Sequence, residues 1–160
     1  MLVETLLGVC AVGFENGVIT KFWLPGLSKA DIKRQADAWS GGLRTENEAL
    51  AKKIQGYFAG EKAKFGEPVN LASLSPFAQK ILKALRKVKF GETVTYGKLA
   101  EIAGAPKSAR GVGAVMARNP IPLIIPCHRV LRSDGGIGGF SGPTGVALKI
   151  KMLKLEGLEA

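Results

Sequence analysis

Two cysteines and a single histidine are the residues in this 160-residue chain best suited to nucleophilic chemistry. Cys127 directly precedes His128 and follows Pro126. A thiol is nucleophilic as its thiolate, and a nearby imidazole or cation lowers its pKa. Cys10 instead lies in an apolar run, where cysteine behaves as a small hydrophobic residue, and we expect it to be buried and inert. The Cys-His pair alone also fits a buried cysteine beside a hydrogen-bonded histidine.

Composition limits the kinds of site and compartment. Two cysteines and one histidine cannot complete the usual four-ligand zinc site, so we expect no metal and free thiols. Hydrophobic residues make up 46% and charged residues 22%, as in globular proteins, and no apolar run approaches the ~20 residues of a membrane-spanning helix. The apolar start lacks a basic leader and is interrupted by Glu4 and Glu15, so we expect a cytoplasmic protein.

Positive charge is concentrated in the second half of the chain. Of the total net charge of +10, residues 1–75 contribute +1 and residues 76–160 contribute +9. A solvated surface would also carry charge, but an excess this uneven favours a half that binds a polyanion. Charge alone does not distinguish DNA from RNA or an acidic membrane.

Residues 1–68 are predicted to form a small α/β unit. Residues 6–14 and 18–24 predict two strands, because Asn16-Gly17 between them is a strong hairpin signal. Two helices follow, each predicted from a polar capping pair. Ser28 with Asp31 begins the first helix, which ends near Trp39, and Gly41-Gly42 breaks the chain. Thr45 with Glu48 begins the second helix, which ends at Gly60. Its inner face is expected to consist of Ala49, Ile54 and Phe58.

Residues 69–160 are predicted to be mainly helical, after a linker in residues 61–74. Ser75-Pro76 predicts a helix to about Lys89, and Thr95 caps a helix that Gly104 ends. A last helix is expected over residues 146–155. The residues expected to face inward on these three helices are Phe77, Ile81, Leu82, Leu85 and Val88, then Leu99, Ile102 and Ala103, then Val146, Ile150 and Leu153.

A further helix, opened by Pro106 and ending before Asn119-Pro120, would complete a helix-turn-helix with the one after Thr95. Many helical proteins contain such pairs. Small residues surround Arg110 on this helix, which fits either a tightly packed internal helix or a surface that a nucleic-acid backbone approaches closely. The isolated arginine favours the second interpretation.

Several separated motifs resemble one known family. Residues 121–126 suit a buried extended segment leading into Pro126-Cys127-His128-Arg129-Val130, which resembles the active-site signature of the O6-alkylguanine-DNA alkyltransferases. The resemblance covers roughly the second half of the chain. The other matching motifs are Asn119-Pro120, Thr95-Tyr96, the Arg110 helix, Gly138-Gly139-Phe140-Ser141 and Leu155-Glu156-Gly157.

The resemblance implies a ribonuclease H-like N-terminal unit and a winged-helix-like C-terminal domain with a helix-turn-helix. It also implies DNA repair by direct reversal, with an alkyl (methyl) group moved irreversibly from O6-alkylguanine in double-stranded DNA to Cys127. The helix-turn-helix would enter the minor groove and the damaged base would be flipped out. We therefore expect a monomer that needs no cofactor and reacts once.

The resemblance assigns a role to each site residue. Cys127 would be the nucleophile, His128 would take its proton through a water, and Glu156 would orient His128. Around the guanine, Tyr96 would bind N3, the Ser141 amide would bind O6, and the carbonyls of Cys127 and Val130 would bind the exocyclic amine. Asn119 would brace the active-site turn, and Lys149 would order the nearby loop. Arg110 would fill the gap left by the flipped base, and the residues that would contact DNA or substrate are Ala109, Gly113, Met116 and Arg129.

Three other classes share part of this pattern. A non-catalytic alkyltransferase-like protein would have tryptophan in place of Cys127. A papain-type hydrolase would not need the Arg110 helix or the basic half, and a helix-turn-helix regulator would not need Cys127, His128 and Glu156 together.

This sequence departs from the family pattern in the glycine-rich loop. Phe140 stands where relatives often carry tyrosine, and residues 142–145 form a slightly longer stretch. The size of the alkyl group that the site tolerates therefore stays open.

Overall fold

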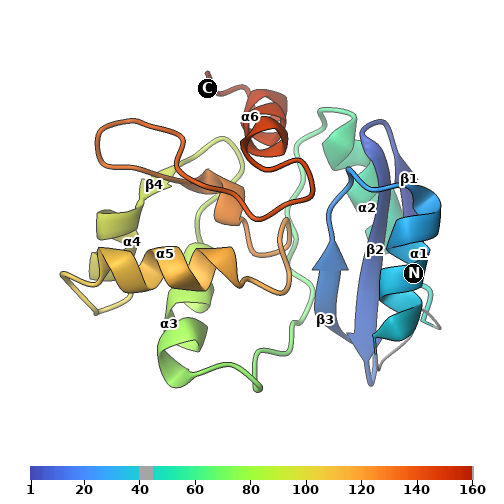
Figure 1. The fold of residues 1–160 in the computed structure, drawn as a ribbon, viewed down its shortest axis with the longest axis horizontal. Helices are drawn as coiled ribbons and strands as arrows, with labels where there is room; N and C mark the ends of the chain where they lie inside the picture. Colours follow the sequence, from blue (N-terminus) through green and yellow to red (C-terminus); the bar gives the residue numbers. More distant parts are fainter. Residues whose placement is uncertain (40–44, 160) are drawn as a thin grey trace.

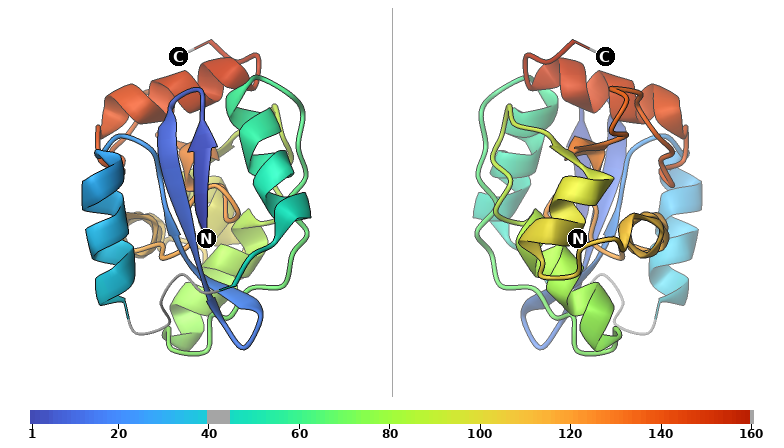
Figure 2. Two further views of the ribbon diagram at one scale, coloured as in Figure 1. Left: turned by 90° about the vertical axis from the view of Figure 1, so that its right-hand side faces the viewer. Right: turned by 90° about the vertical axis from the view of Figure 1, so that its left-hand side faces the viewer.

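The computed structural model describes residues 1–39 and 45–159, so the predicted break at Gly41-Gly42 lies outside it. A three-stranded antiparallel sheet in the order β1-β2-β3 lies at one end of the molecule, and several helices surround the centre at the other end (Figure 1). Figure 2 shows helices α1 and α2 on either side of the sheet and α6 crossing its end. No helix in the described ranges is long and apolar enough to cross a membrane.

The sheet consists of β1 (Leu2–Thr5), β2 (Gly8–Glu15) and β3 (Val18–Trp23). The hairpin at Asn16-Gly17 is confirmed, with φ of 51° and 77° at these residues. The strand predicted over residues 6–14 is confirmed as β2, but it begins two residues later, because the chain turns after β1, a strand that the sequence did not predict. There the Thr5 hydroxyl donates to the Gly8 carbonyl at 2.6 Å and accepts from the Leu7 amide at 3.2 Å.

Both N-terminal helices begin at polar caps. Ser28 caps α1 (Lys29–Ala38) as predicted, because its hydroxyl accepts from the Asp31 amide. The predicted cap at Thr45 is wrong, since the Asn47 side chain accepts from the Leu50 amide and α2 spans Glu48–Phe58. The inner face of α2 therefore begins at Leu50 rather than at Ala49, which is exposed.

The C-terminal half contains α3 (Pro76–Leu85), α4 (Tyr96–Ile102), α5 (Ala109–Ala117) and α6 (Val146–Leu155). The caps at Ser75 and Thr95 are confirmed, although α3 ends earlier than predicted. Two expected core residues, Ile102 and Val146, are exposed by 54% and 41%, because Leu99 and Ala103, and Leu148 and Met152, form the inner faces. Pro106 does not open α5, since Lys107 has a φ of 67°.

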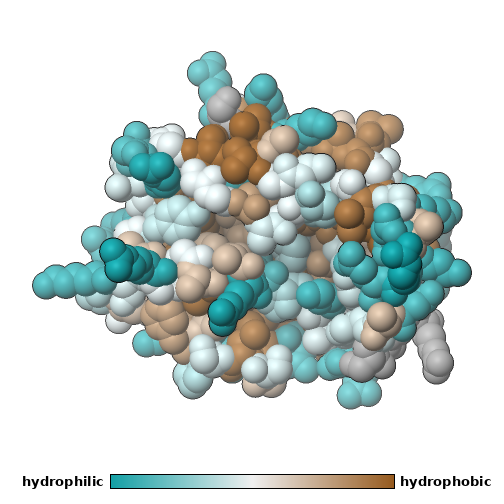
Figure 3. All heavy atoms as spheres, in the orientation of Figure 1, coloured by the Kyte–Doolittle hydropathy of each residue, from teal (hydrophilic) through white to brown (hydrophobic). Residues whose placement is uncertain are grey.

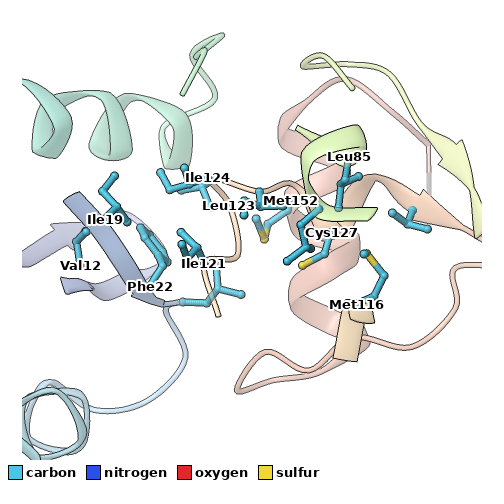
Figure 4. Close-up of a cluster of buried hydrophobic side chains, with 14 of the residues drawn as sticks. Val12, Ile19, Phe22, Leu85, Met116, Ile121, Leu123, Ile124, Cys127 and Met152 are labelled. Carbon is cyan, nitrogen blue, oxygen red and sulfur yellow. The ribbon is translucent and has the colours of Figure 1, made fainter. Parts of the chain in front are cut away.

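The two halves of the chain share one core and one hydrogen-bonded edge. The apolar segment before Cys127, with Ile121, Leu123 and Ile124, lies between the sheet residues and Cys127 (Figure 4). Along the outer edge of β3, Ile19 pairs with the segment at Val69, and the Phe22 amide donates to the Pro120 carbonyl at 2.9 Å. A short parallel pair, β4 (Val94–Thr95) with β5 (Val130–Leu131), brings the start of α4 beside the segment that follows Cys127.

Candidate active site

A tight turn delivers Cys127 to the centre of the molecule. The Asn119 side chain closes this turn, donating to the Ile125 carbonyl at 2.9 Å and accepting from the Ile121 amide at 3.0 Å. Leu123 adopts a φ of 72° within the turn. The chain then forms a short 3₁₀ helix over Cys127–Arg129. The turn therefore fixes the position of the Cys127 thiol at the start of this helix.

Cys127 lies at the inner wall of a cavity of about 400 Å³. The thiol-bearing residue is only 4% exposed. The other residues that line the cavity come from the start of α4, the outer side of α5 and the glycine-rich loop: Tyr96, Gly113, Met116, Ala117, Gly139, Phe140 and Ser141. The cavity thus lies between the helix-turn-helix and the loop. A concave site of this kind can receive a small ligand group.

Burial raises the pKa of the Cys127 thiol, although the Asn119 side chain and the charge of Lys149 partly oppose this. The charge of Lys149 acts in the direction expected of a neighbouring cation, but burial outweighs it, so the net shift of the thiol pKa is upward. The thiol is neutral at rest and needs a base at the moment of reaction. Cys10 is fully buried in β2, where burial also raises its pKa.

Glu156, at the end of α6, is a buried hydrogen-bond hub. Its Oε1 lies 2.6 Å from His128 Nε2 and accepts from the Tyr57 hydroxyl at 2.8 Å. Arg129 donates to both carboxylate oxygens at 3.0–3.1 Å, and the Gly91 amide donates to Oε2 at 2.9 Å. Burial would raise the pKa of Glu156, but the hydrogen bonds from His128 and Arg129 outweigh it and lower the pKa to about 2.

His128 is buried as a neutral imidazole with one nitrogen free. Burial lowers its pKa, although the bond and charge of Glu156 oppose this shift. Because the Glu156 carboxylate can only accept, the ring hydrogen belongs on Nε2, and Nδ1 then carries the lone pair. Nδ1 is buried and has no hydrogen-bond partner among the described residues. His128 is therefore arranged as a proton acceptor at Nδ1.

Tyr57 on α2 belongs to this network, and our sequence analysis missed it. Its hydroxyl lies 3.1 Å from His128 Nε2. The available signal was its position between Ile54 and Phe58, since a tyrosine on a buried helix face needs a partner for its hydroxyl.

The structure places the basic residues near Cys127 in structural roles. Arg129 is 6% exposed, and it donates to Glu156 and to the Val88 carbonyl, so its expected contact with DNA does not fit this burial. Lys149, which was expected to order the loop, is fully buried and donates to the Val130 and Ile137 carbonyls at 2.6 Å. Val130, whose carbonyl was expected to bind substrate, is itself fully buried.

Tyr96 meets the glycine-rich loop at the cavity. A side chain at Gly138 would come within 2.9 Å of the Tyr96 hydroxyl, so glycine permits this close approach. Burial and the nearby Cys127 raise the pKa of Tyr96, which keeps its hydroxyl protonated as a donor.

The small residues of α5 serve two purposes. A Cβ at Gly111 would lie 3.0 Å from the Phe77 ring, whereas a Cβ at Gly113 would meet nothing within 4 Å. Gly111 thus packs α5 against α3, and Gly113 leaves the cavity open. Hydrophilic side chains project over the start of α5 in Figure 3, where Ala109 and Arg110 are exposed.

No group of three His, Cys, Asp or Glu side chains that could hold a metal occurs within the described parts of the chain.

Comparisons with known proteins agree with this arrangement. The family model for the DNA-binding domain of 6-O-methylguanine DNA methyltransferase matches residues 76–158. A methylated-DNA–protein-cysteine methyltransferase of Methanosarcina acetivorans is 35% identical over 150 residues, which cover 93% of this chain and 91% of that protein. Its namesake in Mus musculus is 55% identical over 83 residues, covering 51% of this chain but only 39% of the mouse protein.

A solved structure has a similar fold over nearly the whole length of this chain. The crystal structure of Mycobacterium tuberculosis OGT in complex with DNA superposes with a TM-score of 0.77 at 29% identity, covering 98% of this chain and 91% of that one.

Proposed function

The chain belongs to the 6-O-methylguanine DNA methyltransferase family, whose DNA-binding-domain model matches residues 76–158, and we propose that it repairs DNA by moving an alkyl group from O6-alkylguanine to Cys127. One observation carries this proposal. Cys127 lines the cavity between α5 and the glycine-rich loop, while His128 and Glu156 lie hydrogen-bonded in the adjoining core. That arrangement supplies a nucleophile, a base and a group that orients the base.

In the proposed reaction, the Cys127 sulfur attacks the alkyl carbon, the bond from that carbon to O6 breaks, and a thioether forms. The thiol proton passes through a water to Nδ1 of His128. The guanine leaves with the electron pair of the broken bond and finally takes up a proton. The Tyr96 hydroxyl, at N3, and the Ser141 amide, at O6, stabilise the leaving guanine. Water does not readily cleave a thioether, so each molecule reacts once and needs no cofactor.

Double-stranded DNA reaches this cavity, in our proposal, by way of α5. Arg110, Gly113 and Ala117 follow one another at helical spacing, and Gly113 and Ala117 line the cavity. Arg110 therefore lies on the same side of α5 and is placed to fill the gap that the flipped base leaves. The relative from M. tuberculosis was solved in complex with DNA, which supports DNA as the partner.

We further propose a ribonuclease H-like unit over residues 1–68, a winged-helix-like domain over residues 69–160, and a cytoplasmic monomer. The small antiparallel sheet with its helices supports the first of these assignments, and the α4–α5 pair supports the second.

Duplex DNA with a labelled O6-methyl group tests the proposed function. The wild-type protein should acquire one label per molecule, and Cys127→Ala should bind the duplex without acquiring any. The matched control is Cys10→Ala, which removes the other, buried thiol and should keep transfer. Label that stays on the DNA with the wild-type protein would indicate a regulator or a hydrolase instead.

A further inference from the structure

Tyr57 connects the N-terminal unit to the catalytic histidine. It comes from α2, yet its hydroxyl donates to Glu156 at 2.8 Å and lies 3.1 Å from His128 Nε2. The side chain is fully buried, and packing from both halves of the chain fixes it. Three phenylalanine rings pack against it edge to face: Phe58, Phe65 and Phe90.

We propose that Tyr57 is a positioning residue for alkyl transfer, which keeps His128 neutral, with its hydrogen on Nε2 and its Nδ1 free to accept the thiol proton. This inference rests on the proposed function, because His128 acts as the base only if Cys127 is the nucleophile.

The hydrogen bonds that Glu156 accepts support this role. A hydroxyl has one hydrogen, and in this geometry Tyr57 gives it to Glu156 Oε1, the same oxygen that accepts from His128. The carboxylate therefore divides its charge among several donors. Without the Tyr57 hydroxyl, more of that charge would act on the imidazole and favour its protonated form.

The other charged groups around His128 oppose its protonation. Burial lowers the pKa of His128 most, Glu156 raises it, and the charges of Arg129 and Lys149 lower it further. Tyr57 moderates the one group that favours the imidazolium. Its loss should therefore move the protonation of His128 toward higher pH.

The test compares Tyr57→Phe with the wild-type protein in single-turnover methyl transfer across pH. The acid limb of the rate profile should move up by about one pH unit, with about a tenfold lower rate on that limb, while the alkaline plateau and DNA affinity stay unchanged. Nitrogen NMR adds a direct readout, because His128 is the only histidine in the chain. Phe58→Leu is the matched control, since it disturbs the same core without touching His128.

An unchanged acid limb and His128 titration in folded Tyr57→Phe would overturn the inference, as would an equal shift in Phe58→Leu. If Tyr57→Phe does not fold, the wild-type spectrum decides: a hydrogen on Nδ1 of His128 would also overturn it. A wild-type protein that fails to transfer the methyl group would instead overturn the proposed function, while the NMR comparison would still measure the effect of Tyr57 on His128.

Discussion

The ammonium group of Lys149 donates to the Val130 carbonyl at 2.6 Å, so the last helix holds the segment that follows Cys127. The same group donates to the carbonyls of Ile137 and Gly139 at 2.6 and 3.4 Å. Burial lowers the pKa of Lys149 to about 8, although Cys127 opposes the shift. One buried cation thus ties α6 both to the segment that follows Cys127 and to the glycine-rich loop.

Lys149→Met should therefore loosen the glycine-rich loop. It leaves the buried Val130 carbonyl without its donor, which should lower the free energy of unfolding by about 1–3 kcal/mol. Methyl transfer should slow more than DNA binding weakens, because the loop shapes the cavity. Urea unfolding and single-turnover rates measure both effects. Lys151→Met, on the exposed side of the same helix, is the control, and equal losses in both variants would contradict this role of Lys149.

Stability should fall in acid as Glu156 takes up a proton. Its pKa is about 2 in the folded protein, below the ordinary value of 4.5. The stabilisation from this site is therefore complete above about pH 4.5 and is lost as pH falls from there toward 2. Glu156→Gln should remove that part of the pH dependence and cost roughly 3–5 kcal/mol at pH 7, since it leaves the buried Arg129 without its charged partner.

Urea midpoints between pH 3 and pH 7 measure this effect, with the exposed Glu159→Gln as the control. A Glu156→Gln variant whose stability falls as steeply as that of the wild-type protein over this pH range would show that other groups cause the loss.

Two glycines on α5 should give opposite results when each is replaced by leucine. Gly111→Leu should clash with Phe77 and destabilise the protein by about 1–3 kcal/mol. Gly113→Leu should leave stability nearly unchanged but fill the cavity and block methyl transfer, because nothing lies within 4 Å of its Cβ position. Melting temperatures and transfer rates separate the two effects, and a destabilised Gly113→Leu with normal transfer would contradict this assignment.

The alkylated protein should be less stable than the free protein. Although Cys127 lines the cavity, it is only 4% exposed, so an added methyl group must fit against the side chains around the thiol. Overpacking of this kind costs about 1–3 kcal/mol, and each kcal/mol should lower the melting temperature by about 2–4 °C for a chain of this length. Scanning calorimetry before and after reaction with methylated duplex measures the change, and Cys127→Ala given the same DNA should show none. Equal melting temperatures would refute the prediction.

Local signals predicted the fold best where a residue and its partner are close in the sequence. The Asn16-Gly17 hairpin and the caps at Ser28 and Thr95 depend on contacts within a few residues. The turn after Thr5 was missed because Leu6 and Leu7 look like strand residues, and Leu6 is 79% exposed.

Local sequence patterns predicted less of the active site. Cys127 and His128 are adjacent in the sequence, but the hydrogen bond between His128 and Glu156 was expected only from the family resemblance. The Tyr57–His128 contact spans 71 positions, so no spacing rule indicates it. Arg129 was expected from the resemblance to contact DNA or substrate, and the sequence does not show that Glu156 is buried beside it as an ionic partner.

The hydrogen bonds along the outer edge of β3 also bear on misassembly. Segments around Val69 and Pro120 occupy the backbone groups that an edge strand would otherwise present to another chain. A fragment ending before these segments would carry an open, apolar template for intermolecular pairing. Proteolysis or interrupted synthesis in that region should therefore yield aggregates rather than a free N-terminal unit.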